Sequence, residues 1–204
     1  MLFRSNAGTQ AHDDLLAWRS DADATFAHSI SFDASTLKPQ VAAPHSPANS
    51  TAIDEIGTVR IDQAYIGACT GAKLEDLQMA AEVLRGRRVA PGVRLLIAPA
   101  STRMTHAAAA DGTLATLTAA GAILLPSGCG ACAGYGAGVL AEDEVCISST
   151  ARNFQGRMGH SKALVYLGSP YTVAAAAVAG RITDPREFIG PDQVDPDKLN
   201  QGKS

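Results

Sequence analysis

Three cysteines in glycine-rich surroundings are the residues of this chain best suited to chemistry. Cys129 and Cys132 are separated by two residues in a segment that carries glycine at 128, 130 and 134, and Cys69 lies upstream beside Gly67. If the fold brings three thiolates together, they can hold a metal centre and leave one coordination position open. A ligand bound at that open position could be activated by the metal.

The spacing of Cys129 and Cys132 alone leaves several kinds of site open. It occurs in zinc ribbons, thioredoxin-like redox sites and iron–sulfur sites, and it also fits small buried thiols in a tight turn. A closed zinc site requires a fourth ligand, and no histidine lies beside either cysteine segment. The glycines after Cys132 disfavour the helix that begins at a thioredoxin-like site, and they favour an iron–sulfur cluster surrounded by backbone N–H groups.

The fourth cysteine, Cys146, is predicted to be a core residue. It lies between Val145 and Ile147 in a short apolar run. A lone thiol in such surroundings behaves as a small apolar side chain.

The elements that must position the cysteines are strands that end just before them. Residues 59–66 are β-prone and lead into Cys69, and residues 122–125 lead into Cys129. The other predicted strands cover 93–97, 144–148 and 163–167, and the predicted helices cover 73–88, 101–120 and 170–179. This alternation predicts an α/β fold, a mostly parallel sheet with helices on both faces in three α/β/α layers. Ligand sites of such sheets lie beyond the carboxyl ends of the strands, where both cysteine segments fall.

The pattern divides the chain into three parts. Residues 1–60 are rich in Asp, Ser, Ala and Pro with weak periodicity, and we interpret them as an irregular extension or the remnant of a preceding region. Within them, three prolines in residues 37–49 favour a fixed, extended loop. Residues 61–190 form the predicted α/β domain that holds the metal, and residues 191–204 form a C-terminal tail.

Charge and hydropathy argue against several classes of partner. The formal net charge is -3 and only 18% of residues are charged, with a longest basic run at 85–88, so a nucleic-acid partner is not expected. No apolar run reaches the roughly 18 residues that span a bilayer, and no secretory signal is visible. We expect a cytoplasmic protein in a reducing compartment.

Arg152 and Arg157 are the candidate anion-binding residues. They follow the predicted strand at 144–148 and should face the same crevice as the cysteines. A guanidinium group grips a carboxylate through paired N–H donors, so two of them beside a metal would orient a di- or tricarboxylic acid. The alternative is a solvated loop whose arginines pair with local acids.

As an ordered set these motifs resemble the aconitase family, and within it most of all the large subunits of the 3-isopropylmalate dehydratase and homoaconitase group. The resemblance covers most of the chain. It is carried by residues 33–42, 66–70, 74–77, 126–134, 152–159, 169–175 and 180–185.

The resemblance implies a [4Fe-4S] cluster held by Cys69, Cys129 and Cys132, with one iron open as a Lewis acid. It implies that Arg152 and Arg157 bind substrate carboxylates. The activity would be that of a hydro-lyase that isomerises a hydroxy di- or tricarboxylic acid by dehydration and rehydration, as in leucine biosynthesis. The substrate could also be of the homoaconitase or dimethylmalate dehydratase type. Two other interpretations stay open: the chain could be a non-catalytic iron–sulfur or zinc-binding module, or the cysteines could be only core thiols.

Two positions and one large region depart from the family pattern. Gly71 and Ala151 stand where the family usually has asparagine. The family's large subunit has an earlier half with further active-site residues, and its catalytic serine comes from a swivelling domain or small subunit. We therefore expect the C-terminal part of a large subunit, inactive alone, with a small subunit as heterodimer partner, and no catalytic residue is assigned.

Overall fold

A computed structural model describes residues 18–31 and 33–189. It divides the chain into two compact units, Lys38–Pro191 and a smaller one formed by Met1–Leu37 with Asp192–Ser204. In the smaller unit the described residues contain one short 3-10 helix, η1 (Ala34–Thr36), and Trp18 and Ile30 are each 88% exposed. Residues 1–17 and the predicted tail at 191–204 lie outside the described residues.

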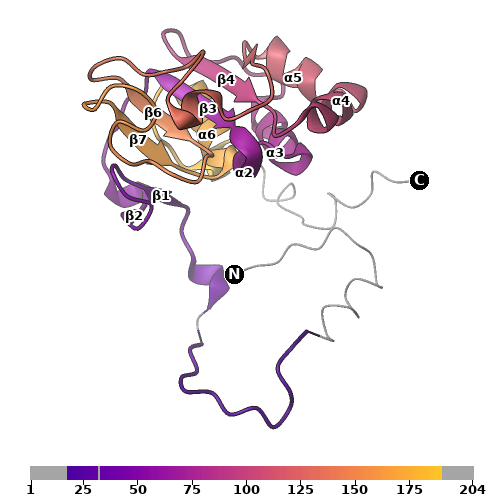
Figure 1. Cartoon of the computed structure of the whole chain (residues 1–204), viewed down its shortest axis with the longest axis vertical. Coiled ribbons are helices and arrows are strands. Elements are labelled where there is room, and N and C mark those ends of the chain that lie inside the picture. Colours follow the sequence, from indigo (N-terminus) through magenta and orange to yellow (C-terminus); the bar gives the residue numbers. More distant parts are fainter. Residues whose placement is uncertain (1–17, 32, 190–204) are drawn as a thin grey trace. The chain divides into compact units, whose positions relative to one another are not determined.

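The larger unit is built on a seven-stranded sheet with the order β2-β1-β7-β6-β3-β4-β5 (Figure 1). The strands are β1 (Gln40–Ala42), β2 (Ser50–Ala52), β3 (Gln63–Gly67), β4 (Arg94–Ala98), β5 (Ile123–Leu124), β6 (Val145–Ser148) and β7 (Leu164–Leu167). The five strands from β3 to β7 pair in parallel, whereas β1 pairs antiparallel with both β2 and β7. The predicted α/β class with a mostly parallel sheet is confirmed.

The helices differ from the predicted pattern at three places: a one-turn helix at 68–71 was not predicted, the helix predicted at 73–88 ends at Leu84, and the region 101–120 forms two helices. They are α2 (Ala68–Gly71), α3 (Leu74–Leu84), α4 (Thr102–Ala110), α5 (Thr113–Ala119) and α6 (Pro170–Ala179), with 3-10 helices η2 (Ile53–Glu55), η3 (Gly130–Ala133) and η4 (Pro185–Glu187). The single helix predicted at 101–120 is wrong, because Gly112 adopts φ 82° and the Asp111 carboxylate accepts the Thr113 N–H. No described helix is long and apolar enough to cross a membrane.

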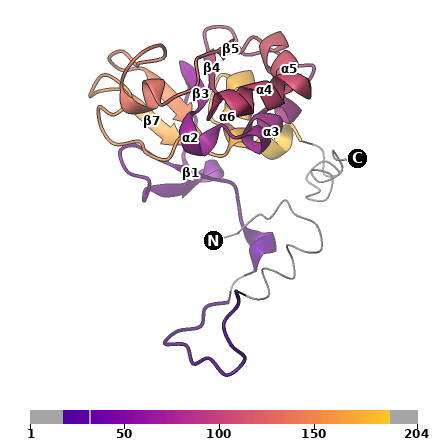
Figure 2. The ribbon, with the colours of Figure 1, turned by 45° about the vertical axis from the view of Figure 1, so that its right-hand side comes forward.

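The two faces of the sheet are covered by different kinds of structure (Figure 2). On one face α3 and α6 pack against Ala64 and Ile66 of β3 and their neighbours in the main apolar core. On the other face a second core forms around Tyr65 of β3 and Leu96 of β4. It is closed by η3 and by the connections on either side of β6, so this face is covered by loops and a short 3-10 helix where a layer of helices was predicted.

The chain changes direction across the sheet between β3 and β6. From β3 it proceeds through α3 to β4 and through α4 and α5 to β5, and then it returns past β3 to β6 and β7. The neighbouring carboxyl ends of β3 and β6 therefore lead into segments that diverge. Open α/β sheets bind ligands at such a topological switch point.

Residues 38–60, which the sequence pattern assigned to the extension, join the sheet at its edge. Val41 of β1 is 1% exposed, and Ala42 pairs with Leu167 of β7. The side-chain amide of Asn153 donates to the backbone carbonyls of Ala43 (2.8 Å) and Val165 (3.1 Å) and ties the edge to the sheet. The compact unit thus begins before residue 61, and two short strands flank the proline-containing turn where a loop was predicted.

Candidate metal centre and anion site

Cys69 lies in a sharp turn at the carboxyl end of β3. Ala68 adopts φ 65°, and the single turn of α2 leaves the Cys69 side chain exposed. The Ser149 hydroxyl, at the end of β6, accepts the Gly67 N–H (3.2 Å) and donates to the Gly71 carbonyl (2.7 Å). The turn that presents Cys69 is therefore fastened to the neighbouring strand at the switch point.

This fastening accounts for Gly71. A Cβ atom at residue 71 would lie 2.1 Å from the Ser149 carbonyl oxygen, far inside van der Waals contact. The backbones that follow β3 and β6 approach so closely that no residue with a side chain has room at position 71 in this arrangement.

Cys129 and Cys132 lie in the loop that follows β5, on the turn of η3. The Cys132 N–H donates to the Cys129 carbonyl (3.0 Å), and Gly134 ends the turn in the left-handed conformation with φ 82°. Cys129 is exposed, whereas Cys132 is 8% exposed. A Cβ at Gly134 would lie 2.9 Å from the Arg157 carbonyl oxygen, so this loop packs directly against the arginine loop.

All three motifs meet over one buried apolar cluster. Its members include Ala68, which precedes Cys69, Ala131 and Cys132 of η3, and Met158, which follows Arg157. The prediction that both cysteine segments lie beyond the carboxyl ends of parallel strands is confirmed, and the arginine loop lies with them.

Neither arginine of the loop pairs with an acidic side chain in the described part of the chain. The four ion pairs found there join other residues. Arg152 is exposed, and the buried Nε of Arg157 has no hydrogen-bond partner among the described residues. Buried donors are nearly always satisfied, and a guanidinium group with an unsatisfied N–H is well suited to bind an anion. This speaks against arginines that only pair with local acids.

The cysteines do not form a binding site for a single metal ion in the described part of the chain. Within the described residues, no three His, Cys, Asp or Glu side chains lie close enough to hold one metal ion. In an iron–sulfur cluster each thiolate binds a different iron, so the sulfur atoms need not meet at one point. Cys69, Cys129 and Cys132 are free thiols, and a Cβ at Gly128, next to Cys129, would meet nothing within 4 Å.

Cys146 is not part of this site. It is completely buried in β6, and burial raises the pKa of its thiol to about 12. A thiol that remains protonated at neutral pH is a poor metal ligand. The prediction of a core residue is confirmed.

Tyr65 is a site residue that the sequence reasoning missed. Its side chain is buried beneath the loop of Cys129 and Cys132, and its hydroxyl lies 3.4 Å from the Cys129 carbonyl oxygen. Burial, followed by the nearby Cys132 and Cys129 thiols, raises its pKa to about 12, so it remains a hydrogen-bond donor at neutral pH. An aromatic residue inside a strand carries no local sign of such a role.

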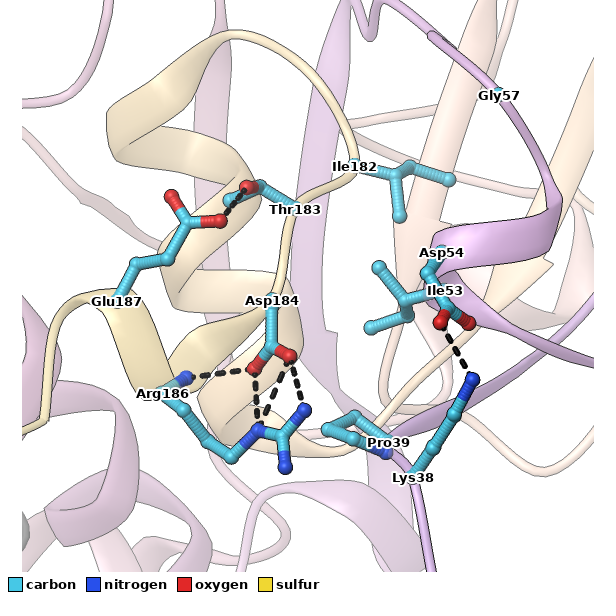
Figure 3. A pocket seen from close by; sticks show the side chains of 10 residues that line it. All are labelled: Lys38, Pro39, Ile53, Asp54, Gly57, Ile182, Thr183, Asp184, Arg186 and Glu187. Carbon is cyan, nitrogen blue, oxygen red and sulfur yellow. Dashed lines mark hydrogen bonds and ion pairs between the residues drawn. The ribbon is translucent and has the colours of Figure 1, made fainter.

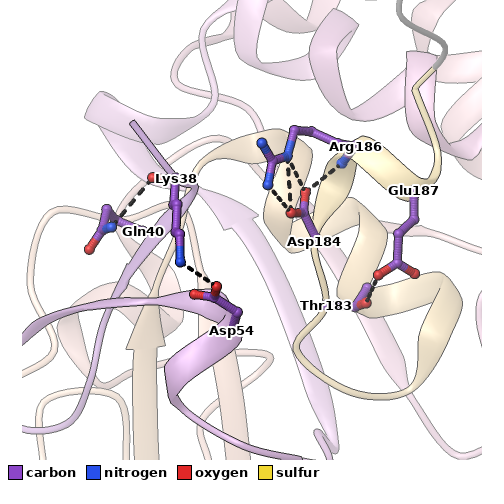
Figure 4. A network of polar contacts seen from close by, with 7 residues as sticks. All are labelled: Lys38, Gln40, Asp54, Thr183, Asp184, Arg186 and Glu187. Atoms are coloured by element: carbon purple, nitrogen blue, oxygen red, sulfur yellow. Dashed lines mark hydrogen bonds and ion pairs between the residues drawn. The ribbon is translucent and has the colours of Figure 1, made fainter. Parts of the chain in front are cut away.

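A separate cavity of about 400 Å³ is lined by residues outside the cysteine loops and the loop of Arg152 and Arg157 (Figure 3). It is lined by Lys38, Pro39, Ile53, Asp54, Gly57, Ile182, Thr183, Asp184, Arg186 and Glu187. Its charged walls are already paired, Lys38 with Asp54 and Arg186 with Asp184, each at 2.6 Å (Figure 4). None of its residues comes from the cysteine or arginine loops, so it is not the candidate site.

Comparison with known proteins gives a consistent result. The model of the aconitase family (aconitate hydratase) matches residues 54–180, more than half of the chain. The chain is 48% identical over 183 residues to the 3-isopropylmalate dehydratase large subunit of Herpetosiphon aurantiacus, which covers 89% of this chain and 44% of that protein. It is 50% identical over 168 residues to the homoaconitase large subunit of Thermus thermophilus, covering 82% of this chain and 40% of that protein.

The chain spans less than half the length of these relatives. The large subunit of 3-isopropylmalate dehydratase from Mycolicibacterium smegmatis shows the same relation, with 46% identity over 195 residues and 46% of its length covered. The match extends from η2 to the residue after α6, and it contains Cys69, Cys129 and Cys132 together with Arg152 and Arg157. The chain belongs to the aconitase family.

Proposed function

We propose that this chain is the cluster-bearing part of a hydro-lyase large subunit of the 3-isopropylmalate dehydratase type. Its reaction would isomerise a hydroxy di- or tricarboxylic acid by removal and readdition of water. The observation that carries the proposal is the convergence of the segments of Cys69, Cys132 and Arg157 on one buried cluster at the switch point of the sheet. Their order along the chain also matches the family motifs.

Cys69, Cys129 and Cys132 would hold a [4Fe-4S] cluster. When bound, the cluster supplies a Lewis acid that favours departure and return of hydroxide without a net redox change. The exposure of Cys69 and Cys129 leaves their side of the site open to a substrate.

Arg152 and Arg157 would bind and orient the substrate carboxylates through paired N–H donors. Asn153 lies between them in sequence and is completely buried, with its amide bonded to the backbones of β7 and the β1–β2 turn. This anchor fixes the start of the arginine loop, so the two guanidinium groups extend from a rigid support. Pre-positioned cations of this kind favour an anionic substrate over water.

The complete active site requires more chain than is present here. The relatives are named as large subunits and are more than twice as long as the matched region. We therefore propose a small subunit as partner, in the cytoplasm, and no activity for this chain alone. The substrate would be of the 3-isopropylmalate, homoaconitate or dimethylmalate type.

Anaerobic reconstitution with iron and sulfide tests the metal centre. We expect a brown protein with about four iron and four sulfide per chain, the composition of a cubane. Cys69→Ser, Cys129→Ser and Cys132→Ser should each lose most of the iron, whereas the control Cys146→Ala should keep it. A colourless reconstituted protein, or equal iron in all four variants, would contradict the proposal.

A non-catalytic iron–sulfur or zinc-binding module is the second candidate function. It is favoured by Ala151, which has no polar side chain at a position where the resemblance leads us to expect asparagine. Co-expression with an aconitase-family small subunit and an earlier-half fragment separates the two functions. Hydratase activity supports the enzyme, and stable metal binding without activity in any pairing supports the module.

A further inference from the structure

Strand β3 reaches the cysteine loop with two buried side chains on one face. Gln63 and Tyr65 are two residues apart, so their side chains leave the strand on the same side. Gln63 Nε2 donates to the Gly138 carbonyl (2.8 Å) and the Tyr65 hydroxyl to the Cys129 carbonyl (3.4 Å). Both side chains are completely buried.

We propose that Gln63 and Tyr65 are positioning residues for the proposed metal centre. They hold the loop of Cys129 and Cys132 at two carbonyls, one near each end. Because Cys69 follows the same strand, β3 fixes all three thiolates relative to one another. The expected effect on the metal centre rests on the proposed function, whereas the contacts of Gln63 and Tyr65 are present in this structure whatever the function.

The orientation of Gln63 is set from its other end. Its Oε1 accepts from Arg94 Nε (3.2 Å) and Nη2 (3.1 Å), and Arg94 Nη2 also pairs with Glu144 (2.8 Å). An arginine side chain has no hydrogen-bond acceptor, so the oxygen of the Gln63 amide must face Arg94 and its nitrogen must face Gly138. A completely buried amide whose two ends are both satisfied is a rigid anchor.

Gly138 is held tightly against the sheet at this anchor. A Cβ there would lie 2.4 Å from Leu96 Cδ1 and 3.4 Å from Ala131 Cβ. The loop at Gly138 is therefore in contact with both β4 and η3, which carries Cys132. Loss of the Gln63 bond would loosen η3 through this contact.

Tyr65 fits its place because residue 67 is glycine. A Cβ at Gly67 would lie 2.1 Å from Tyr65 Cε1. The absence of a side chain at residue 67 lets the ring lie along β3 towards the carboxyl edge. Its 3.4 Å contact exceeds the ordinary O–H···O distance, so Tyr65 should restrain the loop less strongly than Gln63.

Cys132 supplies a direct readout of the loop in the metal-free protein. It is 8% exposed, so its alkylation requires opening of the loop, whereas Cys69 and Cys129 are exposed and serve as internal references. The rates for the three thiols are measured by mass spectrometry after timed treatment with iodoacetamide. Native global stability is checked in parallel by thermal unfolding.

Gln63→Glu removes the donor to Gly138 and keeps an acceptor for Arg94. We expect Cys132 to react about fivefold faster relative to Cys69, the factor that corresponds to one ordinary hydrogen bond. Tyr65→Phe removes a single oxygen atom and should give about a twofold increase, in keeping with its longer contact. The control Tyr166→Phe, half-buried on the helix face of β7, should leave the rate unchanged.

The reconstituted protein gives the second readout. Both test variants should lose iron to a chelator faster than the native protein and show an altered electron paramagnetic resonance signal after reduction, whereas Tyr166→Phe should match the native protein. Equal Cys132 alkylation in all four proteins would overturn the positioning role. If the native protein takes up no iron and sulfide but the alkylation rates differ as expected, the proposed function fails and the positioning of the loop stands. Should Gln63→Glu fold poorly, Tyr65→Phe carries the test.

Discussion

The helix face and the loop face of the sheet bury side chains of β3 and β4 by different means. On the helix face, α3 and α6 present alanine, leucine and valine at helical spacing to the strands. On the loop face the covering chain is glycine-rich and is held by Gln63, Tyr65 and Ser149, whose polar atoms bond to its backbone or to the adjoining turn. Apolar burial stabilises the unit, whereas polar anchors and glycines place the reactive groups.

The difference explains where the candidate chemistry lies. A helix contacts a strand through its side chains, and its own backbone N–H and C=O groups are hydrogen-bonded to one another within the helix. A loop leaves backbone N–H groups and thiols near the surface, and it can be shaped by a few contacts from below. The sheet therefore carries a stable apolar core on its helix face and the candidate site on its loop face.

The largest effect on stability is expected on the helix face. Leu77 of α3 is completely buried in the main core. Leu77→Ala should lower the free energy of unfolding by about 2–5 kcal/mol, because it removes apolar contact and leaves a cavity. Chemical denaturation measures the change, and Arg103→Ala on the exposed side of α4 is the control, with an expected change within about 0.5 kcal/mol. A loss below about 1 kcal/mol for Leu77→Ala would contradict the division between the two faces.

A glycine pair tests the loop face. Gly134 and Gly136 both have left-handed φ values, 82° and 74°, but a Cβ at 134 would meet the Arg157 carbonyl at 2.9 Å and one at 136 would meet nothing within 4 Å. Each alanine substitution should cost about 1 kcal/mol through backbone conformation. Gly134→Ala should in addition reduce iron content after reconstitution, because it separates the cysteine and arginine loops.

Gly136→Ala is the matched control for that contact. It carries the same backbone penalty in the same loop and should retain native iron content. If both variants lose iron equally, backbone conformation rather than the packing of the two loops governs the site.

The sequence predicted the helix face better than the loop face, for a physical reason. Periodicity and caps located α6, which begins at Pro170 and ends before Gly180 as expected, and the start of α3, which ends at Leu84 rather than at residue 88. These signals are local, since each residue and its partners lie a few positions apart. The break at Gly112 was missed because alanine-rich sequence on both sides favours a continuous helix.

The anchors of the loop face left no such signal. Gln63 reaches Gly138 across 75 positions, and Ser149 reaches Gly71 across 78. Strand periodicity assigns Gln63 and Tyr65 only to a face, and it cannot show that a loop carbonyl will lie above them. The sequence proposes the cysteines and arginines as site residues because their residue types and spacing carry chemistry, whereas the residues that contact their loops are visible only in the fold.

The smallest expected effect concerns the polar support behind Gln63. Burial acts to raise the pKa of Glu144, but the Ala141 N–H and Arg94 outweigh it, so the pKa lies below its ordinary value of 4.5. A carboxylate with a depressed pKa stabilises the folded state above pH 4.5 and loses that contribution as the pH falls through the lower folded value. Because the pair is partly exposed, the contribution should be below about 1 kcal/mol.

Glu144→Gln should therefore unfold more easily than the native protein at pH 7, and the difference should shrink as the pH is lowered from about 4.5 to 3. Denaturation midpoints across this range measure it. Glu142→Gln, which removes an exposed partner of Lys162 from the same connection, is the control and should change stability little at any pH. A difference in stability between Glu144→Gln and the native protein that stays constant from pH 7 to pH 3 would contradict this prediction. It would mean that the Glu144 carboxylate does not help to hold Arg94, and that Gln63 alone orients the Arg94 side chain.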